Sequence, residues 1–162
     1  MRVLGIDPSI RRTGYGIIDF AGDKLALVDY GTISPPTDAD MAMRLAVLYD
    51  DVMDLIKTHQ PDEMAIEEAF YGVNVKSAFI LGQARGAAML CGAHHHLPIG
   101  EYAPRKIKLA ATGNGNASKE QVQFMVQRQL NLSDPPQPHD AADALAVAIC
   151  HYRQLRLAEA KP

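Results

Sequence analysis

The order of short apolar runs and longer helical patterns constrains the fold of this chain more than any other feature. Three runs typical of strands, at 3–6, 15–20 and 24–33, are joined by short connections that contain glycine and other turn-forming residues. Such closely connected strands form an antiparallel meander. Apolar residues then recur at helical spacing from Asp38 to His59, so a helix follows the meander.

Helices and short strands alternate in the rest of the chain. Residues 64–66 and 97–102 are typical of short buried strands. Helical patterns occupy 76–95, 104–111, 119–130 and 140–157. This order predicts an α/β fold with a mixed central sheet of about five strands and helices on both faces. We expect a single domain at 1–157, followed by a frayed C-terminal tail at 158–162.

Composition and charge narrow the class of protein. Apolar residues make up 48% of the chain and charged residues 22%, as in a soluble globular protein. The first apolar run is too short for a signal peptide and no stretch resembles a membrane span, so we expect a cytoplasmic protein with no membrane partner. The net charge of −3 excludes a protein that is basic overall, yet bases outnumber acids between 70 and 128. That basic stretch fits a polyanion partner or an ordinary solvated helix surface.

Four carboxylates stand where predicted elements begin or end. Asp7 ends the first strand and Glu67 ends the fourth, and parallel neighbours would bring both to one edge of the sheet. Asp140 and Asp143 are three residues apart at the start of the last helix, so they share a face. Four acids can hold two Mg²⁺ ions across a scissile phosphate. Asp7 could instead be a turn residue, Glu67 a surface acid and Asp140 a helix cap.

Four sequence motifs resemble those of the RuvC family of Holliday-junction resolvases. They are GIDPSIRRTGYGII at 5–18, AIEEAF at 65–70, LGQARG at 81–86 and DAADALAVAI at 140–149. The resemblance covers essentially the whole chain and implies an RNase H-like fold. It also implies a homodimer that needs Mg²⁺ or Mn²⁺, with two ions per subunit.

The activity implied by this resemblance is that of a crossover junction endodeoxyribonuclease. Such an enzyme resolves four-way (Holliday) DNA junctions by paired symmetric nicks that leave 5′-phosphate and 3′-hydroxyl ends. The family acts in homologous recombination and DNA repair, and the resemblance implies the RuvA–RuvB branch-migration complex as a partner. A two-fold dimer suits this substrate because it presents identical sites to two like strands.

The family's catalytic carboxylates correspond to Asp7, Glu67, Asp140 and Asp143. The alternation of a strand agrees with the choice between adjacent acids, because Glu68 points away if Glu67 points into the site. The four acids are therefore the expected metal ligands.

Other positions add candidate roles near these acids. The resemblance makes Lys119, in SKEQV, a catalytic lysine that could stabilise charge on the phosphate, although a plain surface lysine is the alternative. His139 could be a metal ligand or a proton shuttle. The family usually has glycine where this chain has Ser9. If that glycine supplies a positive φ, Ser9 must adopt another turn or accept strain.

Aromatic and basic residues are candidate contacts to DNA. The candidates are Phe70, Tyr71, Lys76, Arg105, Lys106, Lys108 and Lys119. Phe70 could stack on an unpaired base at the junction centre, whereas Tyr71 could simply pack. The group at 105–108 is a basic patch for phosphates or an ordinary solvated face. Arg11 and Arg12 could contact phosphate near the first acid, and the glycines at 82, 86 and 92 predict close helix packing, within the subunit or across a dimer.

Three other functions fit parts of the pattern. An actin-like phosphotransferase or ATPase would need a second lobe and another glycine-rich phosphate loop, and this chain is too short for them. A junction-binding protein without catalysis would lack one or more of the acids, and all are present. A nuclease of the same fold that cuts RNA–DNA hybrids is harder to reconcile with the match across all four motifs.

Overall fold

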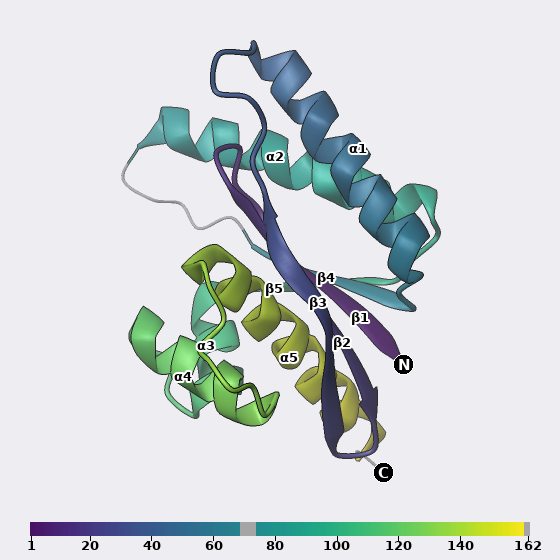
Figure 1. Cartoon of the computed structure of the whole chain (residues 1–162), viewed down its shortest axis with the longest axis vertical. Coiled ribbons are helices and arrows are strands. Elements are labelled where there is room, and N and C mark those ends of the chain that lie inside the picture. Colours follow the sequence, from purple (N-terminus) through teal and green to yellow (C-terminus); the bar gives the residue numbers. More distant parts are fainter. Residues whose placement is uncertain (69–73, 161–162) are drawn as a thin grey trace.

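The computed structural model describes residues 1–68 and 74–160. Its strands form one five-stranded sheet in the order β3-β2-β1-β4-β5, with helices on both faces (Figure 1). The strands are β1 (Arg2–Asp7), β2 (Thr13–Ala21), β3 (Lys24–Ile33), β4 (Glu63–Glu67) and β5 (Ile99–Tyr102). The helices are α1 (Met41–His59), α2 (Val75–His94), α3 (Pro104–Thr112), α4 (Lys119–Gln129) and α5 (His139–Glu159). The predicted element order and mixed sheet are confirmed.

Several element boundaries differ from the prediction by one to three residues, and three of them bear on the site or have a clear cause. Helix α1 begins at Met41 because Asp40 caps it, with Oδ1 accepting from the backbone N–H of Met43 at 2.8 Å. Strand β5 begins at Ile99, two residues later than expected. Helix α5 begins at His139, directly after Pro138, so Asp140 lies in its first turn. The interpretation of Asp140 as the helix cap is therefore wrong.

Strand pairing brings the first two carboxylates to one edge of the sheet. Strand β1 runs antiparallel to β2 but parallel to β4, and β4 runs parallel to β5. Ile6 of β1 pairs with Ile66 of β4. Asp7 and Glu67 are the next residues of these neighbouring strands, so they leave the sheet side by side.

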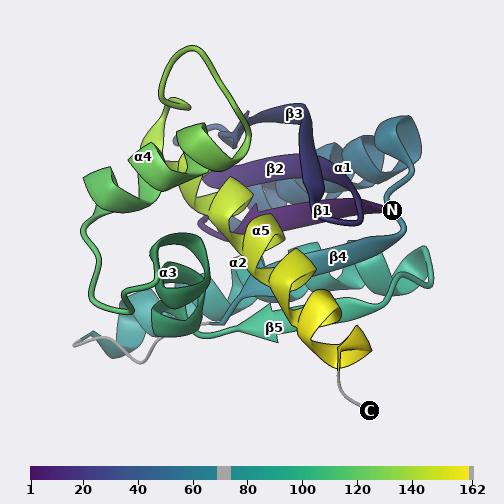
Figure 2. The ribbon, with the colours of Figure 1, turned by 90° about the horizontal axis from the view of Figure 1, so that it is seen from below.

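The sheet separates two hydrophobic cores. Helices α1 and α2 cover one face, and α5 crosses the other face with α3 and α4 beside it (Figures 1 and 2). Leu4 and Ile6 belong to the core under α1 and α2, whereas Val3 belongs to the core under α5. Because side chains alternate along a strand, Asp7 points to the α5 side with Val3. Glu67 does the same, since Ala65 also belongs to the core under α5.

Glycines let the backbone of α5 lie directly on the sheet. A Cβ added at Gly5 would come within 2.7 Å of the Ala148 nitrogen, and one at Gly14 would overlap the carbonyl of Asp140. Only glycine permits so close an approach of two backbones. The contact at Gly14 fixes the first turn of α5 over the end of β1, which is where Asp140 and Asp143 are needed.

Within residues 1–68 and 74–160, no helix combines the length and the apolar character that crossing a bilayer requires.

Candidate active site

Three of the four predicted carboxylates line one hollow at the carboxyl ends of β1 and β4. This hollow has a volume of about 280 Å³. Asp7 and Glu67 reach it from the strands and Asp143 from α5, while Lys108 of α3 and Lys119 of α4 complete its polar lining. Its remaining lining residues are Pro104, Ile107, Val122 and Ala146. We call it the carboxylate hollow.

Burial makes the charged form of the carboxylates in this hollow unfavourable. Burial raises the pKa of Asp7 to about 9, and the nearby negative charges of Glu67 and Asp143 add to the rise. Burial also raises the pKa of Glu67, although a hydrogen bond with Asp7 opposes the rise. The pKa of Asp143 is raised by burial too, against the opposing charge of Lys119. Such a site is stabilised by a proton or by a cation that the carboxylates share.

Asp140 lies at the rim of this group and not inside the hollow. Its Oδ2 lies 3.8 Å from Nη1 of Arg12, and both side chains are partly exposed. Its charge still contributes to the raised pKa values of Asp7 and Asp143. The structure therefore brings all four predicted acids into one neighbourhood, with Asp140 turned toward an arginine.

Two lysines face the acids from the other side of the hollow. Lys119 is the first residue of α4, and its Nζ lies 3.7 Å from Oδ2 of Asp143. Ser118 starts the helix there through a capping box with Gln121. A cation at a helix N-terminus is unfavourable by itself, so the Asp143 carboxylate offsets that cost. Lys108 lines the same hollow, and its charge opposes the raised pKa of Glu67.

The other predicted DNA contacts lie outside the hollow. Lys76, Arg105 and Lys106 are exposed, on the first turn of α2 and on α3, and do not line it. Phe70 and Tyr71 fall at 69–73, outside the described residues.

His139 lies next to the acids without lining the hollow. It is the first residue of α5 and half-buried. Its Nδ1 is buried and has no hydrogen-bond partner in the part of the chain that the structure describes. A positive charge on its ring would oppose the raised pKa of Asp143, so the ring lies close enough to act on that carboxylate.

Arg85 is a supporting residue whose role the sequence pattern did not indicate. It belongs to the LGQARG motif and lies on α2. Its Nε donates to the carbonyl oxygen of Glu67 at 3.2 Å, and its Nη2 contacts the Glu101 carboxylate on β5. The guanidinium therefore fixes the end of β4 against β5. The LGQARG motif drew attention to this segment, but the partners of Arg85 lie on β4 and β5.

The Ser9 turn is held by Thr13. The Thr13 hydroxyl donates to the Ser9 carbonyl at 2.6 Å, and the Ser9 N–H donates to the same hydroxyl oxygen at 3.1 Å. Ser9 is not among the positive-φ residues of the described chain. The loop after Asp7 thus needs no glycine here.

A divalent cation fits this donor set. Among the described residues, no three Asp, Glu, His or Cys side chains already stand close enough to surround one ion. Asp7, Glu67 and Asp143 nevertheless offer hard oxygen donors to one hollow, and their burial leaves them without enough opposite charge. Carboxylates of this kind suit Mg²⁺ or a similar ion, which keeps several waters of its own.

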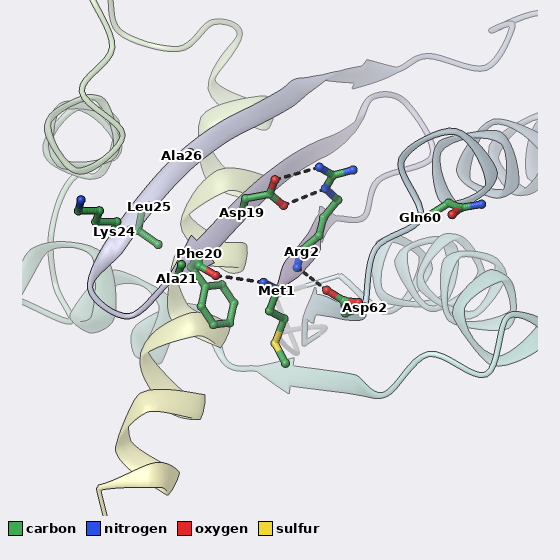
Figure 3. Close-up of a pocket in the computed structure, with 10 residues that line it drawn as sticks. All are labelled: Met1, Arg2, Asp19, Phe20, Ala21, Lys24, Leu25, Ala26, Gln60 and Asp62. Atoms are coloured by element: carbon green, nitrogen blue, oxygen red, sulfur yellow. Dashed lines mark hydrogen bonds and ion pairs between the residues drawn. The ribbon is translucent and has the colours of Figure 1, made fainter.

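A second hollow at the opposite end of the sheet lacks this chemistry. It measures about 470 Å³ and surrounds the start of β1 (Figure 3). Arg2 there makes two contacts with the Asp19 carboxylate, at 2.8 and 2.9 Å, and its backbone N–H donates to Asp62. The Met1 ammonium donates to the Phe20 carbonyl at 3.0 Å. Arg2 and Asp19 are thus already paired with each other, and the Met1 ammonium and Asp62 have backbone partners.

The fold and the carboxylate hollow define the class of protein. A five-stranded mixed sheet with helices on both faces, and acids at the carboxyl ends of two parallel neighbours, is the arrangement of the RNase H-like fold.

Sequence similarity to known proteins assigns the chain to one family within this class. The family described as "Crossover junction endodeoxyribonuclease RuvC" matches residues 3–151. A protein of that name from Dehalococcoides mccartyi is 51% identical over 154 residues, which are 95% of this chain and 92% of the relative. A RuvC from Burkholderia mallei is 53% identical over 152 residues, which are 93% of this chain and 83% of the relative.

A solved structure agrees with these relatives. "T. thermophilus RuvC in complex with Holliday junction substrate" has a TM-score of 0.93 and 32% identity, and the match covers 100% of this chain and 99% of the other. The chain belongs to the RuvC family of crossover junction endodeoxyribonucleases, which are metal-dependent nucleases. The family relation decides against the actin-like and hybrid-cutting alternatives.

Proposed function

We propose that this chain resolves four-way DNA junctions by cutting two like strands at symmetric positions. The observation that carries the proposal is the convergence of Asp7, Glu67 and Asp143 in one hollow that Lys108 and Lys119 face. The family relation supports the junction as substrate, and a relative from T. thermophilus was solved on a Holliday junction. The cellular role is in homologous recombination and DNA repair, in the cytoplasm, alongside the RuvA–RuvB complex.

The carboxylates would hold the metal in this proposal. Asp7, Glu67, Asp140 and Asp143 take Mg²⁺ or Mn²⁺, two ions per subunit, and His139 is a further candidate ligand. When bound, the ions supply charge neutralisation and a water with a lowered pKa. Asp140 has to turn from Arg12 toward the other acids to join them, which its partly exposed side chain permits.

The other groups of the hollow act on the phosphate. Lys119 and Lys108 place positive charge where the attacked phosphate becomes more negative. Water attacks phosphorus, the bond to the 3′-oxygen breaks, and that oxygen gains a proton. The products carry a 5′-phosphate and a 3′-hydroxyl. Arg85 keeps Glu67 in place through the backbone carbonyl.

The remaining candidates extend the DNA contact beyond the hollow. Lys76, Arg105 and Lys106 are exposed, so they can reach backbone phosphates of the junction arms. Stacking by Phe70 and packing or stacking by Tyr71 stay predictions, because both residues lie outside the described part of the chain.

The outer face of α2 supports a homodimer. Phe79 is 73% exposed and Leu90 is 53% exposed, although both are large apolar residues. Gly82 and Gly86 lie between them at helical spacing, and a Cβ at either would meet nothing within 4 Å. This face is opposite the one that packs on the sheet, where Ala84 and Ala88 are buried. A second copy of α2 can approach such a surface closely, and a two-fold axis would then relate two active sites.

A cleavage assay tests the proposed function. With Mg²⁺ or Mn²⁺, the protein should nick a synthetic four-way junction at paired sites and leave a linear duplex of the same sequence uncut. Asp7→Asn should bind the junction but cut it at least 100-fold more slowly, because losing a ligand should cost more than the roughly 10–100-fold lost with an outer-shell partner of a ligand. Equal cutting of the linear duplex, or faster cutting of an RNA–DNA hybrid, would contradict the junction specificity.

A matched pair of variants tests the composition of the site. Asp143→Asn should abolish cutting, whereas Asp134→Asn should not, because Asp134 is exposed and lies in the loop before α5. Retained cutting by the Asp143 variant would remove that residue from the metal site.

A further inference from the structure

Another hollow at the carboxyl end of the sheet contains three arginines. It has a volume of about 920 Å³. We call it the arginine hollow; its lining residues are Ser9, Arg11, Arg12, Ser34, Pro35, Thr37, Arg44 and Asp140. The carboxylate of Asp140 links it to the proposed active site, because Asp140 lines this hollow while its charge acts on Asp7 and Asp143.

The arginine hollow carries more positive than negative charge. Asp140 is the one acid among its lining residues, and it lies 3.8 Å from Arg12, beyond good hydrogen-bond distance. Asp40, on the adjoining segment, is exposed and uses a carboxylate oxygen to cap α1. Within residues 1–68 and 74–160, no carboxylate comes within ion-pair distance of Arg11 or Arg44. Two of the three guanidinium groups therefore lack a counter-charge.

Arg44 holds this site in shape from α1. Its Nη2 donates to the carbonyl of Ile10 at 3.0 Å, which fixes the loop that carries the other two arginines. The Thr13 hydroxyl holds the same loop from its other side through Ser9. The Nε of Arg44 is buried and has no hydrogen-bond partner among the described residues. A buried donor on a charged group is unfavourable unless negative charge lies nearby, and the charge of an anion in the hollow would offset this cost.

The donors of the hollow suit a phosphate. Guanidinium groups bind phosphate oxygens through paired N–H donors, and the hydroxyls of Ser9, Ser34 and Thr37 can add further hydrogen bonds. Ser9 is two residues from Asp7, so the Cα atoms of these two residues, one lining each hollow, lie at most about 7 Å apart. Successive phosphates of a DNA strand advance by roughly 3.4 Å along its axis. A strand held at the carboxylate hollow would thus bring a neighbouring phosphate to the arginines.

We propose that Arg11, Arg12 and Arg44 bind a backbone phosphate of the strand being cut, next to or just beyond the scissile phosphate. The inference rests on the proposed function, because it takes a DNA strand to lie across the carboxylates. The lysines of α3 and α4 contact the strand on the one side of the acids and the arginine hollow contacts it on the other. The site selects no base and fixes the position of the strand.

Junction binding at several salt concentrations tests the proposal. The protein is titrated without divalent metal against a synthetic four-way junction, so that the junction is not cut during the measurement. A change in the contact between Arg12 and Asp140 then cannot affect the result through cleavage. The Arg11→Gln, Arg12→Gln double variant should bind about tenfold more weakly. The slope of log K against log salt should fall in magnitude by about 1. Arg128→Gln, at an exposed arginine of α4, should match the wild type.

Neutral methylphosphonate linkages, placed one at a time around the cut position, locate the phosphate. One position should weaken the wild type about as much as the double substitution does, and should have no further effect on the double variant. The proposal would be overturned if the double variant had the affinity and salt slope of the wild type. It would also be overturned if, at every position, the methylphosphonate weakened the double variant as much as it weakened the wild type. If the wild type cuts the junction and the double variant has the salt slope of the wild type, the arginine proposal is wrong but the proposed function stands. If the wild type does not cut the junction, the proposed function itself fails.

Discussion

At the scale of single residues, Asp7 combines two roles that oppose each other. A carboxylate at the end of β1 is needed to hold a cation, but burial beside other acids makes its charged form costly. Its pKa of about 9, against an ordinary value of 3.8, expresses that cost. Between these two values the folded chain keeps a proton that the unfolded chain releases. The stability of the metal-free protein therefore falls as the pH rises through this window.

The variant Asp7→Asn should remove this pH-dependent cost, because asparagine resembles the protonated acid. We expect it to raise the melting temperature at pH 8 and to leave it nearly unchanged at pH 4. Each 1 kcal/mol relieved corresponds to about 3 °C. Mg²⁺ should raise the melting temperature of the wild type at pH 8 more than that of the variant. Asp134→Asn is the control; equal shifts at pH 4 and pH 8 in the Asp7 variant would show that burial of charge is not the cause.

At the scale of elements, the position of α5 decides whether the acids meet. Two of them come from strands whose spacing the sheet sets, and the others come from a helix that must lie close to that sheet. The near-contact of Gly14 with the backbone of Asp140 makes that approach possible. A single methyl group at this glycine would move the start of α5 away from β1.

Gly14→Ala should therefore lower activity more than the addition of a single methyl group would suggest. We expect junction cutting to fall at least tenfold and stability to fall by about 1–3 kcal/mol, the usual cost of overpacking. Gly31→Ala is the matched control, because the three atoms nearest to a Cβ there belong to the ring of Tyr15 and not to backbone. The measurements are single-turnover cutting and thermal melting. Equal effects of the two alanines would show that the approach of α5 is not limiting.

Elements and acids were predictable from sequence because each depends on local pattern. Asp7 and Glu67 follow apolar strands, and the family motif selected Glu67 over Glu68, in agreement with strand alternation. Side-chain partners from distant segments were not predictable. The hydrogen bond from Arg85 to the Glu67 carbonyl and the orientation of Asp140 toward Arg12 depend on how helices pack, which no local spacing encodes.

At the scale of the whole molecule, the active site and the exposed face of α2 belong to opposite sides of the sheet. The acids face α5, whereas α2 covers the other side with α1 (Figure 2). An assembly built through α2 would leave each carboxylate hollow open to DNA. Association and chemistry can then be separated by mutation.

The double variant Phe79→Glu, Leu90→Glu should convert the protein to a monomer. The apolar patch on α2 would carry like charges across a two-fold axis, so the dimer would lose both its buried area and its close helix contact. Analytical ultracentrifugation measures the change, and cleavage of the two strands should become uncoupled. Phe124→Glu, which replaces another exposed aromatic on α4, should leave the mass unchanged. A double variant that sediments like the wild type would contradict the α2 interface.

The parallel pairing of β1 with β4 has a consequence for how such an enzyme can change over evolutionary time. Because Ile6 pairs with Ile66, the two acids that follow are held apart by the distance between neighbouring strands, roughly 4.8 Å. Backbone hydrogen bonds set that distance, and side chains elsewhere do not. Substitutions can accumulate in α1, in the outer loops and in α2 outside Arg85 without altering the separation of Asp7 and Glu67.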